Sequence, residues 1–324
     1  MRALEEYQKI VFASVDKFLN DTKDEALYEP VKYILSLGGK RMRPVLALMG
    51  NEMFDGNVDD CVTSALGIEV FHNFTLLHDD IMDNAPLRRG EATVHEKWNT
   101  NAAILSGDVM FVQAFTLVTS CKPEHLRAII DIFNVTAIEV CEGQQLDMEF
   151  ETREDVSLEE YLEMIRLKTS VLVGCSLEIG AVLANASKED AKKLYDFGMN
   201  LGMAFQIKDD LLDVFGDAEV FGKQVGGDIL ANKKTYLLLK ALEDADEKQA
   251  NMLKFWMSED ASNPTEKVKA VTAIFEDLRI KDKANALMDE YYDKALNSLN
   301  SINVDQNKKA YFEGFASALM KRKY

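Results

Sequence analysis

The stretch VDDCVTSALGIEVFHNFTLLHDDIMD, residues 58–83, contains the pattern that determines the fold. Its apolar residues recur at the spacing of one helix face, and the periodicity continues for longer than the usual globular helix. The stretch ends in the acidic sequence DDIMD, residues 79–83. It therefore predicts a long helix that carries three carboxylates near its C-terminal end.

Helical periodicity also covers much of the remaining chain, over residues 102–120, 124–150, 158–184 and 188–215. Proline stands before apolar-periodic stretches at positions 30, 44, 123 and 264, where the first turn of a helix tolerates its missing N–H. Pro86 lies in a polar segment, residues 84–90, that predicts a loop. Strand signals are poor because there is no Asn-Gly turn and no clean alternation. We predict an all-α fold, with one domain over residues 1–324.

Composition excludes several classes of protein. With 47% hydrophobic residues the chain can bury a large core, so disorder is excluded. A formal net charge of -18 argues against generic nucleic-acid binding, so any anionic ligand must meet locally concentrated cations. The four cysteines form no CxxC pair, which favours reduced thiols and a cytoplasmic protein. The N-terminus lacks a signal peptide's apolar centre, and Val171 to Ala184 is too short to span a bilayer, so we expect no stable membrane insertion.

One acidic pattern occurs twice in the chain. The two sets have the spacing i, i+1, i+4, and they are Asp79, Asp80 and Asp83 in DDIMD and Asp209, Asp210 and Asp213 in DDLLD. Like charges at this spacing, near a helix C-terminus, destabilise the helix unless a cation compensates them. Magnesium prefers oxygen ligands and bridges carboxylates to substrate phosphates. A single copy could be a solvated acidic helix end, but two copies favour metal sites that share a diphosphate.

Basic groups form two local clusters despite the acidic total. GGKRMRP, residues 38–44, places three cations at a glycine-rich helix entrance, and LRRG, residues 87–90, directly follows the first aspartate cluster. Arginine's planar fork matches phosphate oxygens, and lysine adds a point charge. Each cluster alone is more often ordinary surface. The position of the second one, just beyond a candidate metal site, favours phosphate binding.

Three further polar positions lie on apolar helices. His72 and Gln206 precede Asp79 and Asp209 on the same helix faces and can hydrogen-bond a phosphate without adding negative charge. Polar groups satisfied within the core are the competing interpretation. Lys168, followed by Thr169, is costly on an apolar stretch unless its ammonium reaches solvent or an anion.

The ordered set of segments resembles the trans-isoprenyl diphosphate synthase (polyprenyl synthetase) family. The segments are GGKRMRP, HDDIMDNAPLRRG, CEGQQLD, KT, FQIKDDLLDVFGD and NKKT, and they span most of the chain. The resemblance implies the isoprenoid synthase fold, a bundle of long antiparallel helices around a central cavity, usually in a homodimer. It also implies a head-to-tail (1'-4) transfer of the prenyl group of an allylic diphosphate onto isopentenyl diphosphate, which releases pyrophosphate and gives a short-chain all-trans prenyl diphosphate.

The resemblance also assigns roles to residues. The two aspartate motifs would hold three Mg²⁺ ions on the allylic diphosphate, with the further contacts Arg88, Lys168, Lys223 and Lys233. The isopentenyl diphosphate contacts would be Gly39, Lys40, Arg43, His72 and Arg89. Thr169 and Gln206 would lie beside the developing carbocation, so that Lys168, Thr169 and Gln206 are the expected catalytic residues. Further matches are a polar pair, Gln144 and Asp147, and the basic C-terminal residues 321–323. Ionisation comes first in this mechanism, and the proton leaves to pyrophosphate, so no histidine must act as a base.

Product length would be set by bulky residues upstream of the first aspartate motif. Phe74 lies five residues before Asp79, with Thr75 four and Phe71 eight residues before it. A single aromatic residue there resembles enzymes that make C15 or C20 products. We favour farnesyl (C15) and keep geranylgeranyl (C20) as the alternative. A helical wheel places Phe74 about 140° from Asp79, so its role rests on the resemblance.

Proteins of other classes share some of these features. A helical di-iron protein would use Glu69-x-x-His72, but it needs a second Glu-x-x-His, and the sequence has none. A non-catalytic prenyltransferase subunit would be expected to have eroded metal motifs, whereas both motifs are whole here. A terpene cyclase or head-to-head synthase would not need the GGKRMRP and RRG contacts.

Overall fold

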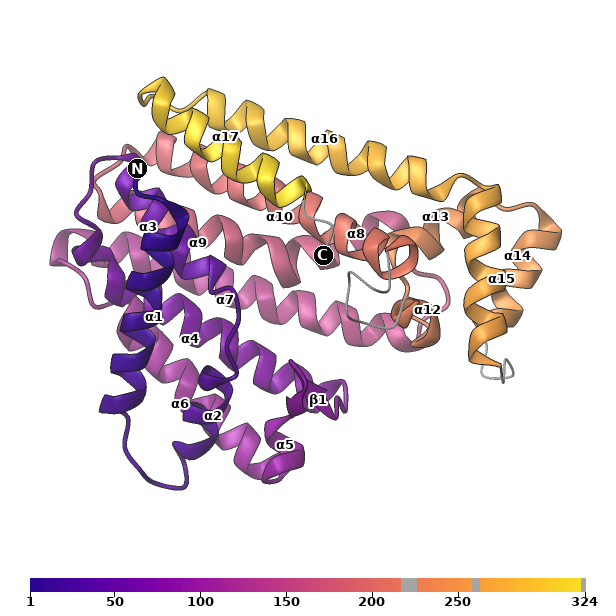
Figure 1. The fold of residues 1–324 in the computed structure, drawn as a ribbon, viewed down its shortest axis with the longest axis horizontal. Coiled ribbons are helices and arrows are strands. Elements are labelled where there is room, and N and C mark those ends of the chain that lie inside the picture. Colours follow the sequence, from indigo (N-terminus) through magenta and orange to yellow (C-terminus); the bar gives the residue numbers. More distant parts are fainter. Residues whose placement is uncertain (217–225, 258–262, 322–324) are drawn as a thin grey trace. The chain divides into compact units, whose positions relative to one another are not determined.

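The computed structural model describes residues 1–216, 226–257 and 263–321, and Figure 1 shows an almost entirely helical chain. The predicted all-α fold is confirmed. Lys223 and most of the basic C-terminal tail lie outside the described residues. The chain divides into two compact units. The first unit contains Met1–Ala137, Leu172–Tyr195 and Ile302–Lys308, and the second unit contains Ile138–Val171, Asp196–Ser301 and Lys309–Tyr324. A single domain around a central cavity remains a prediction.

The first unit is built around one long helix, α4. Its elements are α1 (Leu4–Asp21), α2 (Glu29–Ser36), α3 (Met42–Met53), α4 (Val58–Met82), β1 (Leu87–Arg88), β2 (Glu91–Ala92), α5 (Val94–Lys97), α6 (Thr100–Val118), and parts of α7 (Pro123–Thr152), α9 (Val171–Leu183) and α10 (Lys188–Phe215). Helix α4 contacts α1, α3 and α6. A methyl group on Gly67 would lie 2.6 Å from Val118 N, so α4 and α6 pack closely there. Helix α4 confirms the helix predicted for residues 58–83 and ends one residue earlier than predicted.

A short hairpin follows α4 in the segment predicted as a loop. Strands β1 and β2 pair Leu87 with Ala92 and Arg88 with Glu91. Between them Arg89 and Gly90 both have positive φ, 55° and 85°, as a two-residue hairpin turn of type I′ requires. The strands are too short for an apolar alternation, so sequence patterning could not reveal them. The hairpin fixes the backbone of both arginines just beyond the first aspartate motif.

The second unit surrounds a separate apolar core that includes the fully buried Ile207, Leu237 and Phe275. Its elements are the remaining parts of α7 and α10, with α8 (Leu158–Ile165), η1 (Arg166–Ser170), α12 (Gly227–Leu230), α13 (Tyr236–Asp244), α14 (Glu247–Trp256), α15 (Pro264–Asp277), α16 (Ile280–Asn300) and most of α17 (Gln306–Lys321).

Periodicity located the helices well but missed one irregular turn. The stretch 188–215 is α10, and the four prolines predicted to begin helices all lie in first turns, at positions 30, 44, 123 and 264. The stretch 158–184 is interrupted by η1, a π-helical turn in which the N–H of Val171 donates to Arg166 O, five residues back. None of the four cysteines forms a disulfide.

Candidate active site

The first aspartate motif lies at the C-terminal end of α4. Asp80 is buried there, and Arg88 of the hairpin donates from Nε to both of its carboxylate oxygens, at 2.9 and 2.8 Å. Nη2 of Arg88 lies 2.7 Å from Asp80 Oδ1 and 3.8 Å from Asp79 Oδ2. Asp83 is exposed at the helix end. The structure therefore brings the expected metal and phosphate residues together at this motif.

Arg88 keeps its positive charge in this position. Burial opposes that charge, but the hydrogen bond to Asp80 and the charges of the neighbouring carboxylates outweigh it and raise the pKa of Arg88. A protonated guanidinium next to carboxylates can contact a metal-bound phosphate as well. Arg88 is thus a cation held at the edge of a candidate metal site.

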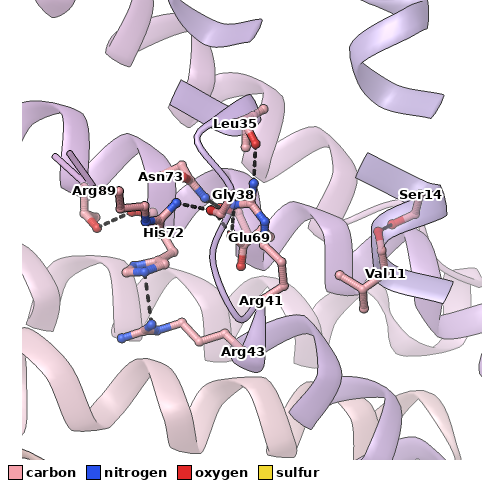
Figure 2. Close-up of polar contacts among 11 residues, drawn as sticks. Val11, Ser14, Leu35, Gly38, Arg41, Arg43, Glu69, His72, Asn73 and Arg89 are labelled. Carbon is pink, nitrogen blue, oxygen red and sulfur yellow. Dashed lines mark hydrogen bonds and ion pairs between the residues drawn. The ribbon is translucent and has the colours of Figure 1, made fainter. Parts of the chain in front are cut away.

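Arg43 and His72 form a second polar contact of the first unit, shown in Figure 2. Arg43 Nη1 donates to His72 Nε2 at 3.1 Å. Burial and the charges of four arginines, Arg43 the nearest contributor, hold the pKa of His72 well below its ordinary value of 6.5. His72 is therefore neutral and accepts the hydrogen bond. Arg43 Nε is buried without an acceptor among the described residues, so this guanidinium can still receive an anion.

Arg41 does not share the role of the cations on either side of it. Its side chain and that of Glu69 are each 2% exposed, and Nη1 lies 2.5 Å from Glu69 Oε1. Nη2 of Arg41 donates to Leu35 O, and Asn73 donates to the same Glu69 oxygen at 2.8 Å. Arg41 is therefore neutralised inside the unit, and it is not among the residues that the resemblance matched to the isopentenyl diphosphate site.

The same contacts remove the di-iron alternative. Glu69 is engaged by Arg41, and His72 is engaged by Arg43, so this Glu-x-x-His pair presents two arginines rather than a metal. The sequence did not predict that Glu69 pairs with Arg41. The Glu-x-x-His spacing shows that Glu69 and His72 share a helix face, but it does not show which side chains that face meets.

The glycine-rich loop and the hairpin meet at Arg89. Its guanidinium donates to Gly38 O, as Figure 2 shows, and a methyl group on Gly39 would lie 2.9 Å from Arg89 Nη2. Gly39 also has φ 124°, where side chains are strained. Lys40 is exposed on the same loop. The five residues matched to the isopentenyl diphosphate site thus all lie in the first unit, on α4, the hairpin, α3 and the loop before α3.

The second aspartate motif lies near the C-terminal end of α10. Asp210 is buried, and its carboxylate accepts hydrogen bonds from the Tyr161 hydroxyl and from Gln206 Nε2, the latter at 3.3 Å. Burial raises the pKa of Asp210 to about 7. Asp213 Oδ2 accepts from the N–H of Asp228 at 2.9 Å. Tyr161 was missed, because a lone tyrosine 49 residues away carries no sequence signal.

Lys168 lies on η1 and meets an anion, one of the two outcomes expected for a lysine on an apolar stretch. Its Nζ is 2.5 Å from Asp147 Oδ2 of α7. Gln144, on the same helix, has its Nε2 buried without an acceptor among the described residues. Thr169 is half-buried beside Lys168, and Lys233 is exposed on the loop after α12. The second unit therefore gathers most of the residues matched to the allylic diphosphate.

The residues expected to control product length lie in an aromatic cluster of the first unit. Phe74 packs on Phe71, Phe111 and His78, with ring centroids 5.7, 5.4 and 4.8 Å apart. Phe71 is fully buried, and Thr75 is half-buried with its hydroxyl bonded to its own helix at His72 O, 2.8 Å away. Phe74 is thus held in place by α6 as well as by its own helix.

The carboxylate motifs suit magnesium only in combination with a substrate. Among residues 1–216, 226–257 and 263–321 no three carboxylate, imidazole or thiol groups converge as a ready-made metal site. Magnesium typically keeps waters and uses one or two carboxylates plus phosphate oxygens, so this donor chemistry fits the ion. The two motifs belong to different units, and their meeting across a cavity stays a prediction.

Comparison with known proteins relates the whole chain to one group of enzymes. The family model "Polyprenyl synthetase" matches residues 24–275. Among curated relatives, the geranylgeranyl diphosphate synthase of Methanosarcina mazei is 42% identical over 235 residues, 72% of each chain. The geranylfarnesyl diphosphate synthase of Natronomonas pharaonis is 39% identical over 257 residues, 74% of this chain and 75% of the relative. A crystal structure of a geranylgeranyl pyrophosphate synthase is 44% identical with TM-score 0.95, covering 100% of both chains.

The helical fold and the two aspartate motifs define a trans-prenyltransferase with the isoprenoid synthase fold, which acts on isoprenoid diphosphates. More specifically, the chain belongs to the polyprenyl synthetase family.

Proposed function

We propose that this chain is a geranylgeranyl diphosphate synthase that extends allylic diphosphates with isopentenyl diphosphate to a C20 product. The observation that carries the product length is the 42–44% identity to geranylgeranyl synthases over 72–100% of the chain. The sequence pattern alone favoured farnesyl diphosphate, and the relatives compared give that preference no support. Geranylgeranyl was the alternative that Thr75 left open, since C15 enzymes often carry a second aromatic residue there.

The assigned allylic site combines carboxylates with cations. Its metal ligands are Asp79, Asp80, Asp83, Asp209, Asp210 and Asp213, which are expected to hold three Mg²⁺ ions. When bound, Mg²⁺ supplies Lewis-acid stabilisation to the departing diphosphate. Arg88, Lys168 and Lys233 bind the same diphosphate, and so does Lys223, which lies outside the described residues. Thr169 and Gln206 present neutral oxygens to the developing allylic cation.

The assigned isopentenyl site holds its diphosphate with cations of the first unit. Arg43 and Arg89 provide planar guanidinium groups, and Lys40 provides an exposed ammonium. His72 stays neutral and orients Arg43. Cleavage of the allylic C–O bond comes first and releases pyrophosphate, and the double bond of isopentenyl diphosphate then attacks the allylic carbocation. The new C–C bond leaves a tertiary carbocation, whose neighbouring carbon loses a proton to that pyrophosphate as the new double bond forms. No protein nucleophile is needed.

A second copy of this chain would cover the apolar outer face of α6. Among the described helices, α6 is the one long and apolar enough, by length and composition, to cross a membrane, with mean hydropathy 1.4 and a third of it buried. Its buried residues form one stripe against α4, while Leu105 and Val112 are 59% and 61% exposed. We propose that a second copy packs on this half-packed helix, so that the chain forms a homodimer. The cytoplasmic location rests on the lack of a CxxC pair among the cysteines and not on this helix. Sedimentation velocity should give a dimer for wild type and a monomer for Val112→Glu. A monomeric wild type would contradict the homodimer.

Product analysis tests the proposal directly. The enzyme is incubated with Mg²⁺, isopentenyl diphosphate and dimethylallyl, geranyl or farnesyl diphosphate, and the dephosphorylated products are separated by chain length. We expect C20 from all three primers and no turnover with excess EDTA. A C15 end product would restore the farnesyl assignment, and C25 would match the geranylfarnesyl relative. No turnover with any primer would overturn the enzyme assignment.

Phe74→Ala tests the aromatic cluster as the limit on product length. Removing this ring from the contacts with Phe71 and Phe111 opens space in the aromatic cluster of the first unit. We expect a shift of the main product from C20 to C25 or longer, measured in the same assay. Phe12→Ala, at an exposed phenylalanine of α1, is the control and should leave C20 unchanged. An unchanged product from Phe74→Ala would remove this residue from length control.

A further inference from the structure

The π-helical turn η1 carries two residues assigned to the reaction, Lys168 and Thr169. A π turn contains one residue more than an α turn and is rarely stable without support from its surroundings, so it occurs mostly at functional sites. Its hydrogen bonding here is explicit, because the N–H of Val171 donates to Arg166 O and the hydroxyl of Ser170 donates to Ile165 O at 3.3 Å. Something in the second unit must favour this conformation over a regular helix.

Helix α7 contacts the turn on one side through a glycine. A methyl group on Gly143 would lie 2.7 Å from Lys168 Cα and 2.8 Å from Leu167 C, with Lys168 N nearer still. These neighbours are backbone atoms, so no side-chain rotation could relieve the overlap. One helical turn further along α7, Asp147 receives the ammonium of Lys168 at 2.5 Å.

Helix α10 contacts the turn through a second glycine. A methyl group on Gly202 would lie 2.9 Å from Ser170 Cα and 3.0 Å from Ser170 Cβ. Gln206, one turn further along α10, donates to Asp210 of the second aspartate motif. Each flanking helix thus has a glycine against the turn and, four residues later, a polar residue of the site.

We propose that Gly143 and Gly202 are positioning residues that seat the π-helical turn and thereby aim Lys168 and Thr169 at the allylic substrate. The glycines act only through their lack of a side chain and touch no substrate. This inference rests on the proposed function, because the roles of Lys168 and Thr169 come from it. It explains why a glycine interrupts the polar segment CEGQQLD.

Gly143→Ala is the decisive variant. The added methyl group must push the turn away by roughly 1 Å, and a misplacement of this size can lower a rate about 100-fold. We expect kcat to fall about 100-fold and KM for the allylic diphosphate to rise. The dissociation constant of isopentenyl diphosphate alone, measured by calorimetry, should stay within twofold, because its assigned contacts lie in the first unit. Gly202→Ala has the milder overlap and should lower kcat about tenfold by the same reasoning.

Gly50→Ala is the matched control. A methyl group there would lie 2.6 Å from Leu177 O, a backbone overlap of similar severity between α3 and α9. It should lower the melting temperature as much as Gly143→Ala does, while kcat per folded molecule stays near wild type. A general loss of packing would instead lower kcat equally in both variants, and that result would overturn the proposal.

A double variant tests whether the glycine acts through the turn. If Gly143 works by aiming Thr169, then Gly143→Ala combined with Thr169→Ala should be little worse than the more damaging single change. Multiplying effects would contradict the proposal, as would unchanged kcat and KM in both glycine variants of an active enzyme. If Gly143→Ala does not fold, Gly202→Ala alone decides. An inactive wild type would instead refute the proposed function.

Discussion

The two aspartate motifs share one sequence pattern but differ in what holds their buried carboxylate. In each motif the second aspartate is the buried one, Asp80 in the first unit and Asp210 in the second. Asp80 accepts hydrogen bonds from the positively charged guanidinium of Arg88. The described hydrogen-bond donors to Asp210 are the neutral Tyr161 and Gln206. A repeated sequence motif therefore fixes the ligand type without fixing the electrostatics around it.

The difference has a chemical consequence. A buried carboxylate is tolerated when charge or hydrogen bonds compensate its desolvation. With Arg88 beside it, the first motif presents carboxylates and a cation proposed to bind phosphate. In the second motif the described donors to Asp210 are neutral, and burial raises the pKa of Asp210 to about 7. We expect that removing a partner of the first motif mainly weakens substrate binding, and that removing a partner of the second motif mainly weakens metal binding.

Loss of a carboxylate from either aspartate motif should have the largest effect on kcat. The effect should be similar for the two motifs, despite their different partners. Asp79→Ala and Asp209→Ala each remove a proposed metal ligand, and a bound metal is worth several kcal/mol of transition-state stabilisation, or about 1000-fold in kcat. Circular dichroism should show unchanged helicity. Asp59→Ala, at an exposed aspartate in the first turn of α4, is the control and should keep its activity. Near-normal rates in both motif variants would show that these carboxylates hold no essential metal.

Arg88→Met should affect the first motif alone. The change leaves Asp80 buried without its cation and removes a bidentate phosphate contact, which together should raise KM for the allylic diphosphate about 100-fold. Arg88→Lys keeps the charge but loses the planar fork, so it should recover only part of this loss. Steady-state kinetics at saturating isopentenyl diphosphate measure both. Equal KM in wild type and Arg88→Met would place this arginine outside the allylic site.

Tyr161→Phe should affect the second motif more gently. The hydroxyl orients the Asp210 carboxylate, and loss of such an outer partner typically weakens a metal site about tenfold. We expect the Mg²⁺ concentration for half-maximal rate to rise by about that factor, with little change in KM for the allylic substrate. Tyr236→Phe, at a buried tyrosine of α13, is the control. A shift in substrate KM without a shift in Mg²⁺ dependence would reverse the roles assigned to the two motifs.

Sequence predicted the features that depend on periodicity and on residue type. It located α4 and α10 almost residue for residue, because both are long stretches rich in apolar residues, although α4 is buried on every side over residues 64–71 rather than along one face. It also predicted that the ammonium of Lys168 reaches either solvent or an anion, since a lysine on an apolar stretch is costly. The anion is Asp147 of α7, one of the two polar residues matched in CEGQQLD.

The features that sequence missed all depend on contacts between distant segments. Arg41 and Arg43 look equivalent in GGKRMRP, and only the position of Glu69 shows that one is neutralised and the other is not. No local sequence pattern marks the π-helical turn. The two glycines that lie against its backbone, Gly143 and Gly202, are on other helices, far from the turn in the sequence. Such features need coordinates, since they arise from packing rather than from local preference.

The smallest expected effect concerns His72, a neutral group among cations in the first unit. Arg41, Arg43, Arg88 and Arg89 all disfavour its protonation, and burial does so most strongly. Because the folded pKa lies below the ordinary 6.5, the unfolded chain takes up a proton that the folded chain refuses as the pH falls below that value. The free energy of unfolding therefore decreases as the pH decreases, by at most about 1.4 kcal/mol per pH unit from this group.

His72→Gln isolates this contribution, since a glutamine oxygen can accept the same hydrogen bond from Arg43 but cannot titrate. Urea unfolding of both proteins at pH 7.5 and 5.5 gives two losses of stability. We expect the loss in wild type to exceed that in the variant by about 1 kcal/mol. Equal losses would mean that His72 titrates normally and that the arginines around it are less concentrated than the structure indicates. The contrast between charged and neutral partners seen at the two aspartate motifs would then not apply to His72.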